Sequence, residues 1–194
     1  MLTHDASPTK TQDQTEWGPD ELALYQAVLE SHGASACRRN ISYEVLQMAM
    51  IGSGSYLQAI AAALSTLGGL HAPLTHTYDL LHRFNTVDVA RTLLEQDHMI
   101  PGWGNSFVKG EPDALWSRPA ALVAQLGPGL MERIDGVTAL LHQQGKPIYP
   151  NPSCWTAAAG ILLGFTRQTV GFLFLQGRLP AWTRALQAME ADDD

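Results

Sequence analysis

The chain has 194 residues and a mass of 21.1 kDa, which is enough for one hydrophobic core but leaves little room for two catalytic domains. Hydrophobic residues make up 45% of the chain and charged residues 16%, and this low proportion of charge suggests that a partner covers part of the surface. The net charge of -7 argues against nucleic acid or an anionic membrane as the main partner.

The cysteines and histidines indicate the redox environment and the absence of a metal centre. The two cysteines, Cys37 and Cys154, are far apart and form no CxxC pair. This arrangement predicts neither a disulfide framework nor a zinc knuckle, and it favours the reducing cytoplasm. His76, His82 and His98 lack the i,i+4 spacing and the neighbouring acids of metal ligands, so we predict no metal site.

Tails are expected at both ends of a single domain. The polar segment 1–17 lacks the apolar run of a signal peptide and predicts a solvated tail. Residues 18–190 are expected to form one all-α domain, which is followed by the acidic tail 191–194. The apolar stretch 155–175 is interrupted by polar residues at 166–168, so no membrane span is predicted.

Helical periodicity, with Gly and Pro at the boundaries, predicts an all-α fold of about ten short helices. In chain order, we expect helices at residues 19–32, 42–50, 55–67, 73–84, 87–97, 119–126, 130–144, 155–163, 167–175 and 180–189. Gly33 is expected to end the first helix, and Pro180 is expected to start the last. The helix at 55–67 is small and apolar nearly all round, so we expect it to be buried or to lie in a subunit interface.

Three loops at predicted helix junctions place polar residues next to Gly or Pro. Their sequences are GGLHAP at 68–73, IPGWGNS at 100–106 and YPNPSC at 149–154. Backbone amides at helix junctions are unpaired and can hold an anion or a carbonyl oxygen. These loops therefore predict where a binding site would lie.

In this order and at these separations, the loops resemble segments of the citrate synthase family that read roughly GPLHGGA, GFGHRVYK and YPNVDFY. The segment GRLPAW at 177–182 is similar to the family's A/G-R-x-x-G-W. The resemblance covers residues 53–190 and implies an all-α fold, with a part like the family's small domain at about 77–165 and a few flanking large-domain helices. The chain has roughly half the length of a typical member. That length implies that exposed helices are covered by a homodimer through 55–67, or by a second chain that supplies the missing large-domain half.

The family joins acetyl-CoA to a 2-oxo acid or reverses that step, and the resemblance assigns candidate roles to residues of this chain. His71 matches the histidine that stabilises the enolate oxygen, Asn105 replaces a second histidine, and Ser153 replaces the catalytic aspartate. Asn and Ser form hydrogen bonds but do not ionise near pH 7, so ordinary citrate synthesis is not expected. Arg178 matches an arginine that clamps a substrate carboxylate, and Cys154 is a candidate nucleophile at a helix N-terminus.

Each of these residues also has a purely structural interpretation. His71 can be a structural hydrogen-bonding group, Asn105 a turn residue, Ser153 the N-cap of the following helix, Arg178 a helix-end arginine and Cys154 a core residue.

Two further positions weaken the expected binding of substrates. The family's D-P-R-A segment, whose arginine is a second carboxylate ligand, reads E-P-D-A at 111–114, and Ser106 replaces an arginine near the CoA site. A dicarboxylate and the CoA phosphate are therefore expected to be held less well.

Two function classes remain open, with a third behind them. The first is a divergent enzyme, an acyltransferase or a citryl-CoA-type lyase, that acts on a CoA thioester or a carboxylic acid through His71, Asn105 and Ser153. It would need no tightly bound cofactor. The second is a catalytically inactive binding or partner subunit. The third is a thioester hydrolase that depends on Cys154.

Overall fold

The computed structural model describes residues 16–38, 40–66 and 73–192. The described residues form nine α-helices and one short 3₁₀ helix, with no β-strand among them, which confirms the predicted all-α class. An isolated bridge pairs Trp103 with Pro150. Within the described part of the chain, no helix combines the length and the apolar character needed to cross a membrane.

The helices follow one another through short connections. In chain order they are α1 (Pro19–Ser35), α2 (Ile41–Ser53), α3 (Tyr56–Ser65), α4 (Leu74–Leu81), α5 (Thr86–Glu95), η1 (Ala114–Trp116), α6 (Ser117–Leu126), α7 (Pro128–Gln143), α8 (Pro152–Leu162) and α9 (Gly171–Asp192). Most of the predicted helices are found within a few residues of their expected limits.

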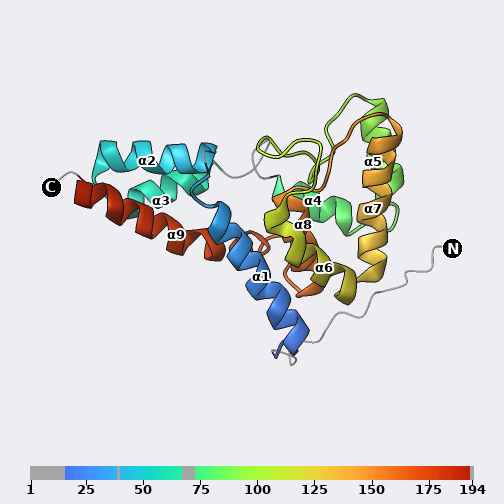
Figure 1. The fold of residues 1–194 in the computed structure, drawn as a ribbon, viewed down its shortest axis with the longest axis horizontal. Helices are drawn as coiled ribbons and strands as arrows, with labels where there is room; N and C mark the ends of the chain where they lie inside the picture. Colours follow the sequence, from blue (N-terminus) through green and yellow to red (C-terminus); the bar gives the residue numbers. More distant parts are fainter. Residues whose placement is uncertain (1–15, 39, 67–72, 193–194) are drawn as a thin grey trace.

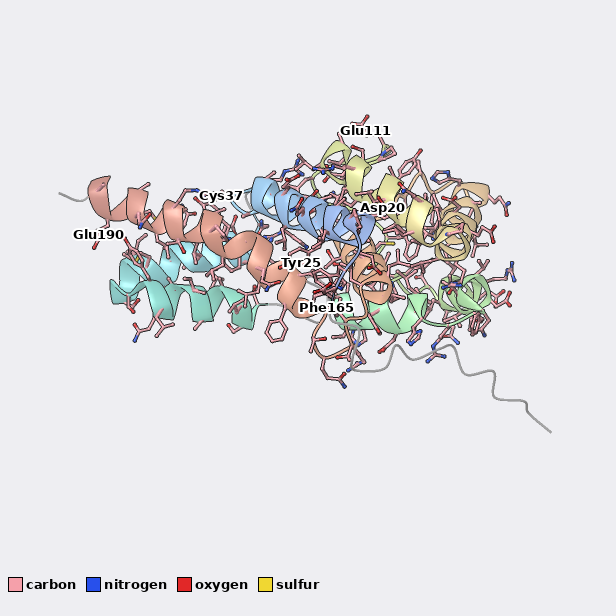
Figure 2. The ribbon with its side chains drawn as sticks, turned by 90° about the horizontal axis from the view of Figure 1, so that it is seen from below. Asp20, Tyr25, Cys37, Glu111, Phe165 and Glu190 are labelled. Carbon is pink, nitrogen blue, oxygen red and sulfur yellow. The ribbon has the colours of Figure 1, made fainter. Side chains whose placement is uncertain are left out.

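The molecule has a body and an arm (Figure 1). We use "body" for α4 to α8 with η1, and "arm" for α2, α3 and the C-terminal half of α9, which extends to the left in Figure 1. Helix α1 packs against α6 and α8 in the body and also against α9, so it joins the two parts. In Figure 2, Cys37 marks the end of α1 beside α9, and Glu190 lies near the far end of the arm.

The last helix corrects one prediction. Separate helices were expected at 167–175 and 180–189, but α9 is a single helix with Pro180 inside it. A proline removes one helical hydrogen bond and ordinarily breaks or kinks a helix. Here buried residues lie on both sides of Pro180: Phe174 before it, and Trp182 after it, whose indole donates to Ala36 O at 3.1 Å. This packing on both sides outweighs the local cost of the proline.

The end of α1 corrects a second prediction. Gly33 was expected to end this helix, but α1 continues to Ser35. A Cβ at Gly33 would lie 3.3 Å from Gly177 O, and a Cβ at Gly177 would lie 2.5 Å from His32 Cβ. The two glycines therefore serve the close crossing of α1 and α9 rather than a helix end, and this crossing brings His32 near the turn that carries Arg178.

Candidate functional site

Two of the three loops singled out in the sequence lie side by side and are joined through their backbones. Gly104 N donates to Tyr149 O, and Asn151 N donates to Gly102 O, both at 2.9 Å. The Asn151 side chain adds a third bond, from Nδ2 to Gly104 O at 2.8 Å. These bonds bring together two segments that are distant in the sequence.

Glycine is required at two positions of the first of these loops. Gly102 has φ 91° and Gly104 has φ 90°, in the left-handed region that side chains disfavour. A Cβ at Gly102 would also lie 2.5 Å from Thr77 Cγ2 on α4. The G-W-G sequence thus allows the loop to turn tightly and to approach α4.

A cavity of about 190 Å³ lies where these loops meet α1, α8 and α9. The cavity has room for a small organic acid, and because it is partly open to solvent it can also take the acyl end of a larger molecule. Its polar lining residues are His32, Ser35, Arg38, Asn40, Asn105, Ser106, Asp113, Asn151, Ser153, Thr156 and Arg178. Three predicted site residues, Asn105, Ser153 and Arg178, therefore line one cavity.

Arg178 is buried in the cavity wall without a counter-ion among the described residues. Arg178 exposes only 7% of its surface to solvent, and its Nε and Nη1 atoms are buried with no hydrogen-bond partner. Burial lowers the pKa of Arg178 to about 10, although the nearby Cys37 acts in the opposite direction. The side chain thus remains cationic at neutral pH. It lies within α9 and not at a helix end, which corrects that alternative interpretation.

A second arginine of the cavity, in contrast, is paired. Arg38 Nη1 lies 3.0 Å from Asp113 Oδ2, and the side chain of Asp113 is only 4% exposed. The same Oδ2 accepts from Asn105 Nδ2 at 3.2 Å, while Oδ1 accepts from Leu115 N at 3.2 Å. Both oxygens of the Asp113 carboxylate are therefore engaged.

Asn105 has the structural role proposed for it as a turn residue. Its Oδ1 accepts from Phe107 N at 2.9 Å, and its Nδ2 donates to Asp113. An amide nitrogen carries two hydrogens, so one N–H of Asn105 remains for a ligand in the cavity.

Ser153 is not the N-cap that one interpretation expected. Asn151 caps α8 instead, because its Oδ1 accepts from Ser153 N at 2.9 Å and from Cys154 N at 3.3 Å. Helix α8 consequently begins three residues before the predicted start. Ser153 lies in its first turn, lines the cavity, and its hydroxyl forms no hydrogen bond with a described residue.

His32, on α1, is a buried neutral imidazole next to Arg178. Its Nε2 lies 2.8 Å from Thr156 Oγ1, and that hydroxyl donates its only hydrogen to Pro152 O at 2.7 Å. We therefore assign the proton to Nε2, which leaves Nδ1 as an acceptor without a partner. Burial, and secondly the charge of Arg178, holds the pKa of His32 well below its usual value of 6.5.

The remaining two candidates are His71 and Cys154. His71 lies outside the described residues. Cys154 is fully buried, is absent from the cavity lining, and has a pKa that burial raises. A buried neutral thiol is typical of a packing residue rather than a nucleophile. Among the described residues, no group of three or more His, Cys, Asp or Glu side chains could hold a metal ion.

Among the lining residues that sequence reasoning missed, three carry titratable side chains: His32, Arg38 and Asp113. His32 sits in the last turns of an ordinary helix, where no motif distinguishes it. Arg38 was unremarkable because its partner Asp113 is remote in the sequence. The only available signal was the substitution in E-P-D-A, which identified Asp113 as a replacement but not as a partner of Arg38.

Comparison with known proteins supports the fold. The structure is similar to that of citryl-CoA lyase from Hydrogenobacter thermophilus, with a TM-score of 0.72 and 21% sequence identity over 88% of this chain and 70% of that chain. No protein-family model matches the sequence, and a search of curated proteins finds no significant match. The citrate synthase-like fold implied by the resemblance is confirmed by this structural neighbour.

Proposed function

We propose that this protein binds the carboxylate of a small acid, free or as part of a CoA thioester, with Arg178 as the anchor. The observation that carries the proposal is the pair of unpartnered, buried guanidinium nitrogens of Arg178 in the wall of a cavity. A buried charge without a partner is costly, and a ligand carboxylate would both neutralise it and accept its hydrogen bonds.

The lyase-like fold and the polar lining support a chemical step on that ligand, either C–C cleavage of a 3-hydroxyacyl-CoA thioester, which is the reaction type of a citryl-CoA lyase, or the related acyl transfer. Cleavage transfers the hydroxyl proton to a water molecule, breaks the bond between the carbinol carbon and the thioester α-carbon, and leaves an enolate that takes up a proton from water, so that no proton is gained or lost overall. In this proposal His71 donates to the thioester oxygen, and the free N–H of Asn105 donates to the new keto oxygen. The Ser153 hydroxyl lies next to the α-carbon.

Binding without turnover is the second candidate, and one observation favours it. Asp113 is the only carboxylate in the described lining, and both of its oxygens already accept hydrogen bonds. The free Nδ1 of His32 is shielded within the protein. The described lining therefore offers no freely available proton acceptor, which a binding subunit would not need.

Calorimetric titration of pyruvate and 2-oxobutyrate tests the binding proposal, and CoA and acetyl-CoA, which carry no carboxylate, serve as comparison compounds. Wild-type protein should bind at least one of the two acids, and Arg178→Met should lose that binding because the anchor is removed while the aliphatic stem is kept. Arg91→Met is the matched control, since Arg91 is half exposed and pairs with Asp88 on α5, outside the cavity. Equal affinity in wild type and Arg178→Met would refute the role of Arg178.

We also propose that the protein self-associates through α3 and its neighbours in the arm. Only Ala59 and Ala63 of α3 are buried, while Leu57 is 78% exposed. Exposed Met48 and Ile51 on α2 add to the same arm. Such apolar surface supports either a homodimer or a second chain that completes the fold.

A further inference from the structure

The two arginines of the cavity differ in whether a protein group pairs with them. Arg178 has buried donors that no described residue accepts, whereas Arg38 is held at 3.0 Å by Asp113. Asp113 is itself fixed by Asn105 and by Leu115 N, so the ion pair sits in a preorganised arrangement on the wall. The cavity therefore contains one cation ready for a ligand and one that is already neutralised.

The charges of the described lining residues sum to a net charge of +1. Arg178 and Arg38 contribute two positive charges, Asp113 contributes one negative charge, and the buried His32 is neutral. A ligand with one carboxylate would bring this lining to neutrality. A ligand with two carboxylates would leave an excess negative charge in a cavity of about 190 Å³ next to the buried side chains of Arg178 and Asp113, where Coulomb interactions are stronger than in water.

We propose that Asp113 makes this site selective for acids that carry a single carboxylate. The inference rests on the proposed carboxylate-binding function and adds the substrate class. A second carboxylate next to Asp113 would meet a negative charge and would also have to compete with it for Arg38. An uncharged end, such as a methyl or a carbonyl group, meets no such repulsion, and a carbonyl oxygen can also accept a hydrogen bond from the remaining N–H of Asn105.

Two acids of matched shape test the selectivity: 2-oxobutyrate, which ends in a methyl group, and oxaloacetate, which has a carboxylate in its place. Calorimetry on wild-type protein should give a Kd at least about tenfold lower for 2-oxobutyrate than for oxaloacetate. Asp113→Asn retains an oxygen for Leu115 N but frees Arg38. This variant should reduce the ratio of the two Kd values to within about threefold or invert it.

A reciprocal variant and a charge-matched control complete the experiment. Arg38→Gln leaves Asp113 without its cation and should raise the preference for 2-oxobutyrate at least about threefold. Asp79→Asn makes the same change in net charge at an exposed residue that pairs with Arg167 outside the cavity, and it should leave the ratio unchanged. If Asp113→Asn fails to fold, the ratio of the two Kd values in Arg38→Gln tests the role of Asp113 by itself.

The possible outcomes distinguish a failure of the selectivity proposal from a failure of carboxylate binding itself. Wild-type protein that binds oxaloacetate as tightly as 2-oxobutyrate, or variants at Asp113 and Arg38 that leave the ratio unchanged, would overturn the role of Asp113 while the carboxylate-binding function stands. Wild-type protein that binds none of 2-oxobutyrate, oxaloacetate and pyruvate would overturn both proposals. Opposite shifts of the ratio in the two variants would support the inference.

Discussion

The guanidinium carbon of Arg178 lies 4.3 Å from the centroid of the Phe174 ring, one turn earlier on α9. This cation–π contact is the main compensation that the described residues offer to the buried charge, since two of the guanidinium nitrogens lack partners. The buried charge of Arg178 therefore lowers the stability of the ligand-free protein.

Arg178→Met should therefore stabilise the ligand-free protein. The substitution removes a buried charge. The desolvation cost of that charge is larger than the stabilisation from its cation–π contact with Phe174, and methionine keeps the apolar packing on the Phe174 ring. We expect the free energy of unfolding to rise by about 1 kcal/mol or more. Urea denaturation measures this change, with Arg91→Met as a control that should stay within about 0.5 kcal/mol of wild type. A clear loss of stability would show that the charge has a partner in the folded protein.

The stability of the protein should fall in mild acid because of His32. Burial depresses the pKa of His32 below its unfolded value of 6.5, so below pH 6.5 the unfolded chain takes up a proton that the folded chain does not. Unfolding is thereby favoured by about 1.4 kcal/mol per pH unit, from pH 6.5 down to the folded pKa, and this effect vanishes above pH 6.5. Denaturation curves at pH 7.5 and pH 5.5 measure this dependence.

His32→Gln serves as the matched variant for this pH dependence. The glutamine side chain does not titrate. The change in the free energy of unfolding between pH 7.5 and pH 5.5 should therefore be about 1 kcal/mol smaller in this variant than in the wild type. A lower stability of this variant at both pH values would not affect the comparison, because the difference between the two pH values is the readout. Identical pH dependence in wild type and variant would contradict a neutral, buried His32.

The crossing of α1 and α9 should not tolerate a side chain at Gly177. A Cβ there would lie 2.5 Å from His32 Cβ and 2.9 Å from Leu29 O, so the helices must separate. We expect Gly177→Ala to cost about 2 kcal/mol or more. Gly52→Ala is the control, because no atom lies within 4 Å of a Cβ on that helical residue. Its higher helix propensity should stabilise the protein by about 0.5–1 kcal/mol. Equal melting temperatures for the two variants would contradict the close crossing.

Self-association through the arm should depend on the exposed leucine of α3. Sedimentation velocity is expected to show a dimer for the wild-type chain and a monomer for Leu57→Asp, since Leu57 is 78% exposed in the isolated chain. Phe84→Asp makes the same kind of change at a residue that is 83% exposed but lies outside the arm, and it should leave the dimer intact. A wild-type monomer would favour the alternative in which a second chain covers the arm.

Local signals in the sequence predicted the helical class, and the family resemblance pointed to three residues that line the cavity. Helix periodicity and the Gly and Pro boundaries predicted the all-α class, because these signals act within a few residues of the chain. The polar residues at the two described loops, Asn105 and Ser153, and the arginine of GRLPAW were identified from motif order, and they line the same cavity.

Features that depend on contacts between distant segments emerge in the folded chain alone. The tertiary structure extended α9 through Pro180, because Phe174 and Trp182 are buried on either side, and it made Gly33 part of a helix crossing rather than a helix end. It also paired Arg38 with Asp113 and left Arg178 unpaired. The charge state of the site follows from these pairings, and no local pattern encodes them, because an ion pair depends on where two segments meet in space.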